Sequence, residues 1–254
     1  MELESYLQKK LKEKDILLMT HIVLGYPSFK ESFQIIEEMV AAGVDIMELQ
    51  IPFSEPIADG PVILRANQKA LENGATVQDC LAMAQKAAET FDIPFLIMTY
   101  YNILYKYGVP EFTAKMASSS IAGAIIPDLP PEEGSAYLTF MEKSKLAPII
   151  IFSPTTTSDR MQYLADFAKG FIYCIARKGV TGEKTTFSNK LSDYLSGCHN
   201  VTSLPIAVGF GIKDRQDIQF LKGKAEIAVI GSQTIRIMEQ DGITAVGNFI
   251  LSLQ

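Results

Sequence analysis

Two carboxylates, Glu48 and Asp59, lie where an apolar run gives way to a loop rich in proline and glycine. Glu48 belongs to the run Asp45–Leu49, which is typical of a buried strand. A carboxylate buried there is unfavourable unless it is hydrogen-bonded, protonated or used in chemistry. Asp59 lies in the following loop, where helical and sheet geometry do not constrain a side chain. One acid in an apolar wall and one on an adjacent loop predict general acid–base chemistry with two different roles.

Each acid also has a structural interpretation. Glu48 could be a buried carboxylate paired with a neighbouring strand. Asp59, which precedes Gly60 and Pro61, could be a turn-forming residue. The residues themselves leave both alternatives open.

Glycine turns follow two later apolar runs, Pro205–Val208 and Ile227–Ile230. Gly211 lies in the first turn, Gly231 and Ser232 lie in the second, and a helix-period segment follows each. Glycine allows a ligand to approach the backbone, and a helix N-terminus presents unpaired N–H groups. Either turn alone is a weak signal, because glycine is common at such positions. Together they predict a phosphate site.

The segment Arg177–Thr186 is long for a loop between a strand and a helix, and it contains two glycines and several polar residues. Such loops are often lids, so we expect one here. Gly182 could offer a backbone N–H to an anion. Thr181 could form a hydrogen bond with Asp59 when the lid closes.

Eight short runs rich in Val, Ile, Leu and Met predict strands of a parallel sheet that is buried on both faces. These runs are Ile16–Val23, Asp45–Leu49, Phe95–Tyr100, Gly123–Ile126, Pro148–Phe152, Gly170–Ile175, Pro205–Val208 and Ile227–Ile230. The helix-period segments are Ser28–Gly43, Thr76–Thr90, Val109–Ser118, Pro131–Lys145, Ser158–Ala168, Ser188–Ser196, Asp214–Lys222 and Ser232 to the C-terminus. This alternation over 254 residues predicts a single-domain (β/α)8 TIM barrel spanning 1–254. A doubly wound open sheet is the alternative, but it usually has fewer strands.

An extra N-terminal helix is expected within Glu2–Lys12, where Leu3, Leu7 and Leu11 form an apolar stripe that would cover the barrel's N-terminal end. Glu48 then falls at the C-terminal end of the second strand, on the face where barrel active sites lie. Strand alternation puts Glu48 on the face opposite Met47 and Leu49. We expect those two apolar residues to meet the helices, so Glu48 would point into the lumen.

A net charge of -6 without a dense basic run argues against nucleic acid or an anionic membrane as the main partner. The N-terminal segment has no signal or transit character, and an odd set of cysteines (Cys80, Cys174 and Cys198) without a CxxC pair suits a reducing cytoplasm. We therefore expect a cytoplasmic protein. Two histidines give no credible metal site, and His21 is expected to be an ordinary wall residue.

Residues 48–61 read Glu-Leu-x-Ile-Pro-Phe-Ser-x-Pro-x-Ala-Asp-Gly-Pro, which resembles the second-strand signature of the tryptophan synthase α subunit family. Further blocks resemble the family in the right order and extend over nearly the whole chain. They are Leu24–Pro27, Asp128–Pro130, Gly179–Gly182, Gly209–Gly211 and Gly231–Ser232.

The resemblance implies a lyase that cleaves indole-3-glycerol phosphate to indole and D-glyceraldehyde 3-phosphate by a retro-aldol reaction. Glu48 would be the general acid/base, Asp59 would accept a hydrogen bond from the indole N–H, and Tyr173 would lie near Glu48. The other implied residues are Gly182, Gly211, Gly231 and Ser232 for the phosphate, and Met98, Ile125, Ile151, Phe210 and Thr181 for the indole pocket and lid. No cofactor is implied for this chain. The implied partner is a β subunit that carries pyridoxal phosphate, in an αββα heterotetramer.

Some residues depart from the family pattern. Gln50 stands where glycine is usual, and Glu55 where aspartate is usual. Pro127 and His21 occupy places where a small residue and an apolar residue are expected. Two other functions stay open: an allosteric activator of the β subunit with weak intrinsic activity, and another phosphate-binding barrel enzyme such as a sugar-phosphate isomerase.

Overall fold

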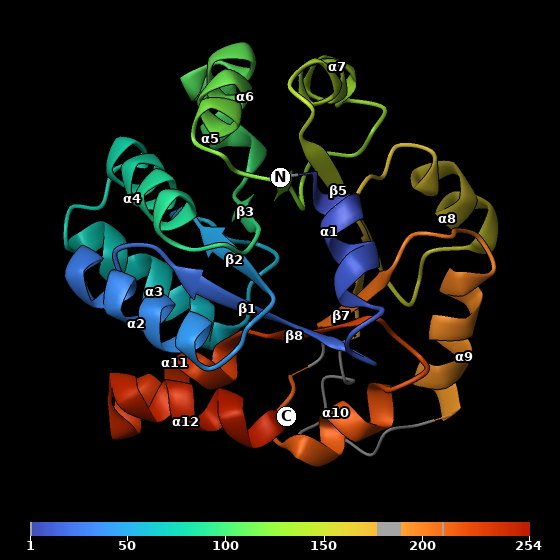
Figure 1. The fold of residues 1–254 in the computed structure, drawn as a ribbon. Helices are drawn as coiled ribbons and strands as arrows, with labels where there is room; N and C mark the ends of the chain where they lie inside the picture. Colours follow the sequence, from blue (N-terminus) through green and yellow to red (C-terminus); the bar gives the residue numbers. More distant parts are fainter. Residues whose placement is uncertain (1, 177–188, 210) are drawn as a thin grey trace.

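The computed structural model describes residues 2–176, 189–209 and 211–254. Parallel strands pair in chain order and close into a barrel, and a ring of helices surrounds it (Figure 1). The strands are β1 (Leu17–Val23), β2 (Ile46–Gln50), β3 (Phe95–Met98), β4 (Gly123–Ile125), β5 (Ala147–Phe152), β6 (Ile172–Ile175), β7 (Ile206–Gly209) and β8 (Ile227–Ile230). The predicted (β/α)8 fold is confirmed, with each predicted strand in place.

The helices that accompany the strands in the described ranges differ from the prediction at a few points. They are α1 (Leu3–Lys10), α2 (Phe29–Ala41), α3 (Pro61–Glu72), α4 (Val77–Thr90), α5 (Tyr101–Tyr107), α6 (Val109–Ser118), α7 (Ser135–Lys143), α8 (Ser158–Ala165), α9 (Asn189–His199), α10 (Arg215–Leu221), α11 (Ser232–Asp241) and α12 (Ile243–Leu253). Helices α3 and α5 were not predicted. The predicted last helix is two helices, because Gly242 adopts φ +86° between α11 and α12.

The helix predicted from Pro131 begins only at Ser135, because residues 131–133 form a turn in which the N–H of Glu133 bonds to the carbonyl of Pro130 at 3.0 Å. The predicted start of α2 is confirmed, since the Ser28 side chain accepts a hydrogen bond from the N–H of Glu31. Start signals of this kind fix where a helix begins.

The two faces of each strand enter different apolar cores. Ile46 packs in the lumen with Met19 and Leu96, whereas Met47 and Leu49 pack outward against the helices. Because successive side chains of a strand alternate between faces, Glu48 points into the lumen, as predicted.

Helix α1 closes the end of the barrel where the strands begin. Figure 1 shows α1 crossing the centre of the barrel, inside the ring of outer helices. Leu3 and Leu7 are buried in the lumen core, and Leu11 packs against it. The N–H of Gly170 donates to Glu4 Oε1 at 3.1 Å. The predicted role of the N-terminal stripe is confirmed.

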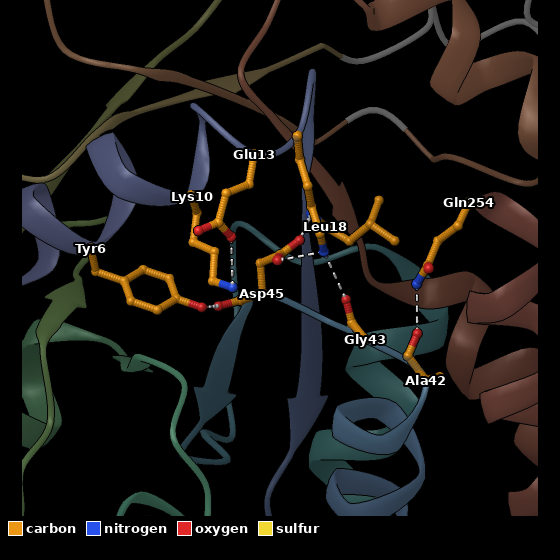
Figure 2. Close-up of polar contacts among 9 residues, drawn as sticks. Tyr6, Lys10, Glu13, Leu18, Ala42, Gly43, Asp45 and Gln254 are labelled. Atoms are coloured by element: carbon orange, nitrogen blue, oxygen red, sulfur yellow. Dashed lines mark hydrogen bonds and ion pairs between the residues drawn. The ribbon is translucent and has the colours of Figure 1, made fainter.

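A group of contacts, which we term the basal clasp, joins α1 to the starts of β1 and β2 (Figure 2). It centres on the buried Asp45, whose Oδ1 accepts from Lys14 Nζ at 2.6 Å and whose Oδ2 accepts from the Leu18 N–H at 3.0 Å. The Tyr6 hydroxyl donates to the Asp45 carbonyl at 2.9 Å. The basal clasp therefore connects three elements at the end of the barrel opposite the strand C-termini.

The C-terminal helix packs beside α2. Gly247 faces Glu38 so closely that an added Cβ would lie 2.8 Å from its carboxylate. Gln254 Nε2 donates to the carbonyl of Ala42 at 2.6 Å, just after the end of α2 (Figure 2). The last residues of the chain are thus held next to the basal clasp.

None of the helices in the described ranges is both long and apolar enough to cross a membrane. Cys80, Cys174 and Cys198 are buried free thiols, and the last two Sγ atoms lie 3.5 Å apart. Groups of three or more potential metal-ligating side chains are absent from the described part of the chain.

Candidate functional site

The strand register places His21, Glu48 and Gly231 next to one another at the C-terminal end of the barrel. His21 on β1 is the lateral partner of Glu48 on β2. On the other side Thr20 pairs with Ile230 of β8, so Gly231 follows next to His21. A Cβ added to Gly231 would lie 3.8 Å from the His21 Cβ and 3.9 Å from its Nδ1. His21 therefore separates the acid from the glycine turn after β8.

Glu48 is only 4% exposed, and its Oε2 has no hydrogen-bond partner among the described residues. Burial raises the pKa of Glu48 to about 7, the nearby His21 lowers it, and the charge of Asp59 raises it. Both protonation states are therefore populated near neutral pH. A carboxyl group of this kind can give and take a proton in one reaction cycle.

Asp59 is held by two side-chain donors on the same oxygen. Its Oδ2 accepts from Gln50 Nε2 at 2.7 Å and from the Tyr100 hydroxyl at 3.2 Å. The Tyr100 oxygen in turn accepts from the N–H of Ala58 at 3.1 Å. The backbone of Asp59 does form a turn, with its N–H bonded to the Pro56 carbonyl at 3.0 Å. Its side chain, however, is directed back to the barrel strands.

Phe53, near the start of this loop, contacts Tyr100 at the end of β3 and Asn67 in α3. Phe53 stacks on Tyr100 with 5.1 Å between the ring centroids. The N–H of Phe53 donates to Asn67 Oδ1 at 2.9 Å, and Asn67 itself is fully buried in α3. The loop that carries Asp59 is therefore supported at Phe53, near its start, and at Ala58 and Asp59, near its end.

Gln50, Tyr100 and Asn67 are the site residues that the sequence does not single out as functional. Gln50 carries a signal, because it lies two residues after Glu48 and so shares its face of the strand. Tyr100 ends a predicted strand with a polar group. Burial, and then the charge of Asp59, raise the pKa of Tyr100, so its hydroxyl stays a neutral donor.

Tyr173 lies on β6 and packs against the lumen core. Burial holds the pKa of Tyr173 well above its ordinary value, and the charges of Glu48 and Asp59 raise it further. Gly209 on β7 is tightly apposed, since an added Cβ would lie 2.8 Å from the Tyr173 hydroxyl oxygen. Tyr173 is thus a neutral phenol near Glu48, where the sequence predicts it, and it is also near Asp59.

The predicted apolar residues also meet in the lumen. Met98 on β3 is the lateral partner of Ile125 on β4, and both are buried. Ile151 is the partner of Tyr173 and packs against the same core. Thr181, Gly182 and Phe210, together with the predicted lid, lie outside the described residues.

The glycine turns present backbone rather than side chains. Gly231 is the N-cap of α11 and Ser232 is its first residue, and no side chain of the described residues caps this helix. Gly211 is exposed and adopts φ +87°, a conformation that favours glycine, and no described atom lies within 4 Å of the position of a Cβ. The turn at Gly211 is therefore open to an approaching anion, whereas His21 and Ile63 border the turn at Gly231.

A family model described as "Tryptophan synthase alpha chain" matches residues 7–248. The chain is 61% identical over 251 residues to the tryptophan synthase alpha chain of Desulforapulum autotrophicum, with 99% of each chain covered. It is 59% identical over 252 residues to that of Syntrophotalea carbinolica, covering 99% of this chain and 100% of the relative.

Solved structures agree with these relatives. The aminoacrylate-bound tryptophan synthase from M. tuberculosis superposes with a TM-score of 0.90 at 26% identity, covering 100% of this chain and 98% of that one. The tryptophan synthase subunit alpha from Legionella pneumophila gives a TM-score of 0.89 at 29% identity, covering 100% and 97%. The range matched by the family model includes every residue of the candidate site.

Proposed function

Because the chain belongs to the tryptophan synthase alpha chain family, we propose that Glu48, Asp59 and Tyr173 perform the chemistry of that family. The chain is a carbon–carbon lyase that cleaves indole-3-glycerol phosphate to indole and D-glyceraldehyde 3-phosphate, the alpha-subunit step of tryptophan biosynthesis. The observation that carries the assignment of residues is Glu48, a carboxyl group buried in the lumen whose Oε2 has no hydrogen-bond partner among the described residues, so that burial raises its pKa to about 7.

Cleavage requires the indole ring to leave as a neutral molecule, so ring carbon C3 must gain a proton. Glu48 in its protonated form supplies that proton, and positive charge develops on the ring nitrogen. The resulting carboxylate then takes the proton of the side-chain hydroxyl next to C3. The O–H electron pair forms the aldehyde C=O, and the electrons of the broken carbon–carbon bond return to the ring. Glu48 ends protonated, as it began.

Asp59 stabilises the cationic intermediate by accepting the hydrogen bond of the ring N–H. Both donors from the described residues lie on its Oδ2, so its Oδ1 is the oxygen that we assign to the substrate. A charge held in place before the reaction stabilises a developing charge without reorganisation. Tyr173, a neutral hydroxyl beside Glu48, orients the acid and the reacting side chain.

The two ends of the substrate fit different walls of the lumen. Buried Met98 and Ile125 support an indole slot, and α11 supports a phosphate site at its uncapped N-terminus. The full proposed sets are Met98, Ile125, Ile151, Phe210 and Thr181 for the indole pocket and lid, and Gly182, Gly211, Gly231 and Ser232 for the phosphate.

The wider context is also proposed. The chain forms a single domain and works in the cytoplasm without a cofactor of its own. It associates with a β subunit that carries pyridoxal phosphate, in an αββα heterotetramer. The family match and the similarity to tryptophan synthase structures support this assembly.

The test is the release of indole from indole-3-glycerol phosphate, with and without the β subunit, by wild type, Glu48→Gln and a control, Glu13→Gln, at an exposed residue of the opposite end. We expect wild-type activity that rises with the partner. Glu48→Gln should lose about 10²–10⁴-fold in kcat, because general acid–base help is lost. The control should match wild type.

Two outcomes separate the claims. Absence of indole release by wild type under every condition would contradict the lyase function and leave an activator of the β subunit. Full activity of Glu48→Gln would contradict only the role of Glu48. Unfolding curves of both variants confirm that any loss is chemical.

A further inference from the structure

A series of hydrogen bonds, buried between His21 and Gln50 and part-buried at Asp59, connects β1 to the loop acid. His21 Nε2 lies 2.7 Å from Gln50 Oε1, and Gln50 Nε2 lies 2.7 Å from Asp59 Oδ2. Gln50 is completely buried and His21 is 4% exposed. Short hydrogen bonds in a water-poor environment are stronger than those at the surface, so these contacts restrain the side chains of His21, Gln50 and Asp59.

The direction of each hydrogen bond follows from the groups themselves. A carboxylate only accepts, so the Gln50 atom that faces Asp59 is the NH2 group. The amide oxygen then faces His21, whose Nε2 must carry a proton to donate to it. The reverse orientation of the amide would place two oxygens 2.7 Å apart. Asp59 therefore fixes the orientation of the Gln50 amide, which presents its NH2 group to Asp59 and its oxygen to His21.

The second hydrogen of the same NH2 group is directed to α3. Gln50 Nε2 lies 3.5 Å from Asn67 Oδ1, which also accepts from the N–H of Phe53 at 2.9 Å. Asn67 Nδ2 donates to the Ile63 carbonyl at 2.9 Å, which fixes the orientation of that amide. Gln50 is thus held from both sides while its donor meets the acid.

We propose that Gln50 is a positioning residue for Asp59, and that His21 anchors it. Gln50 and Tyr100 bind the same carboxylate oxygen, so together they turn Asp59 Oδ1 toward the reacting ring. This inference rests on the proposed function, because it assumes that Asp59 accepts from the ring N–H. It assigns a task to two residues that depart from the pattern of the family.

The effect of Gln50 should appear in kcat rather than in KM. The charge on the ring nitrogen develops only after the substrate is bound, so a misdirected Asp59 loses stabilisation of the later, cationic state. A residue that only supports the fold would instead lower the midpoint of unfolding and affect catalysis independently of Asp59.

The experiment is a double-mutant cycle of Gln50→Met and Asp59→Asn in the indole-release assay with the β subunit. Methionine keeps the length of the side chain and removes both polar groups. Gln50→Met should lower kcat by about 10- to 100-fold, as expected for one lost hydrogen bond to a charged group, with KM changed less than about twofold. In the Asp59→Asn background the same change should alter kcat less than about twofold, because the residue on which it acts is already disabled.

Two further variants complete the design. His21→Phe keeps the ring shape and removes the anchor, so it should lower kcat in the same direction as Gln50→Met. Thr20→Val is the matched control. It removes a buried hydroxyl on the same strand whose Oγ1 has no partner within the described ranges, and it should leave kcat unchanged.

Three outcomes decide between the interpretations. Wild-type kcat in Gln50→Met, or losses that multiply in the double variant, would overturn the positioning role. An inactive wild type would instead overturn the proposed function. If Gln50→Met does not fold, Gln50→Leu replaces it, since leucine is also apolar and lacks both polar groups of the amide. Full kcat in that variant would equally overturn the proposal.

Discussion

Glu48 is held in an environment that favours its neutral form, and this links the stability of the protein to pH. Burial raises its pKa to about 7 in the folded chain from an ordinary value of 4.5, while the facing His21 lowers it and Asp59 raises it. Tyr173, also in the lumen, stays neutral. Below pH 4.5 Glu48 is protonated in both the folded and the unfolded chain. As pH rises from 4.5 to 7, the unfolded chain releases this proton while the folded chain retains it, so stability falls over this range and the loss is complete above pH 7.

We therefore predict that Glu48→Gln becomes more stable relative to wild type as pH rises. The gain should be small near pH 5 and reach about 3 kcal/mol at pH 8, because each unit of pKa difference corresponds to about 1.4 kcal/mol. Urea unfolding of both proteins at pH 5, 6.5 and 8 measures it. A difference that does not vary with pH would show that Glu48 titrates normally.

The sequence singles out the proposed catalytic residues one by one, but it does not predict the contacts between them. Glu48 was identifiable because a carboxylate interrupts an apolar strand, and alternation gave its direction. The role of Gln50 could not be predicted, because it depends on Asp59 returning from the loop to meet β2. That return is set by Tyr100 and Asn67, which come from elements distant in sequence.

Among secondary-structure elements, the strands were predictable and some helices were not. Strands buried on both faces give continuous apolar runs, which stand out without reference to the rest of the fold. Helix α3 was missed because its buried face consists mainly of small residues and Asn67, so its apolar stripe is weak. Helix α5 follows directly after Tyr100 and has only seven residues, too few for a clear period.

Helix α1 provides an element whose contribution is testable. Leu7 is completely buried in the lumen core, whereas Lys9 on the same helix is exposed. Leu7→Ala should lower the free energy of unfolding by about 2–5 kcal/mol, because a cavity remains in a closed core. Lys9→Ala should change it by less than about 0.5 kcal/mol. Urea unfolding measures both values.

The Leu7→Ala substitution should leave catalysis unchanged. Helix α1 lies at the end of the barrel opposite Glu48, so kcat of the folded Leu7→Ala variant should equal that of wild type. A variant with normal stability would contradict the structural role that we assign to α1.

For the molecule as a whole, the two ends of the barrel have separate tasks. The strand C-termini carry the acids and the glycine turns, while the basal clasp joins α1, β1 and β2 at the other end. Such a division allows one end to be changed for function without loss of the core.

Asp45→Asn tests this separation. The buried carboxylate uses one oxygen to pair with Lys14 and the other to accept from the Leu18 N–H. Asparagine has one acceptor oxygen and no charge, so it cannot keep both contacts. We predict a loss of about 1–3 kcal/mol in the free energy of unfolding with unchanged kcat. A large loss of kcat in folded Asp45→Asn would show that the two ends are coupled.

The hydrogen bond between the Gln254 side chain and the Ala42 carbonyl has a practical consequence for work with this protein. It holds Gln254, the residue that follows α12, beside the basal clasp, and α1 lies at the same end of the barrel (Figure 1). A fluorophore, an affinity handle or a sensor surface attached at either of these helices would face away from the acids and glycine turns. An immobilised layer oriented in this way would present its reactive ends to the solution.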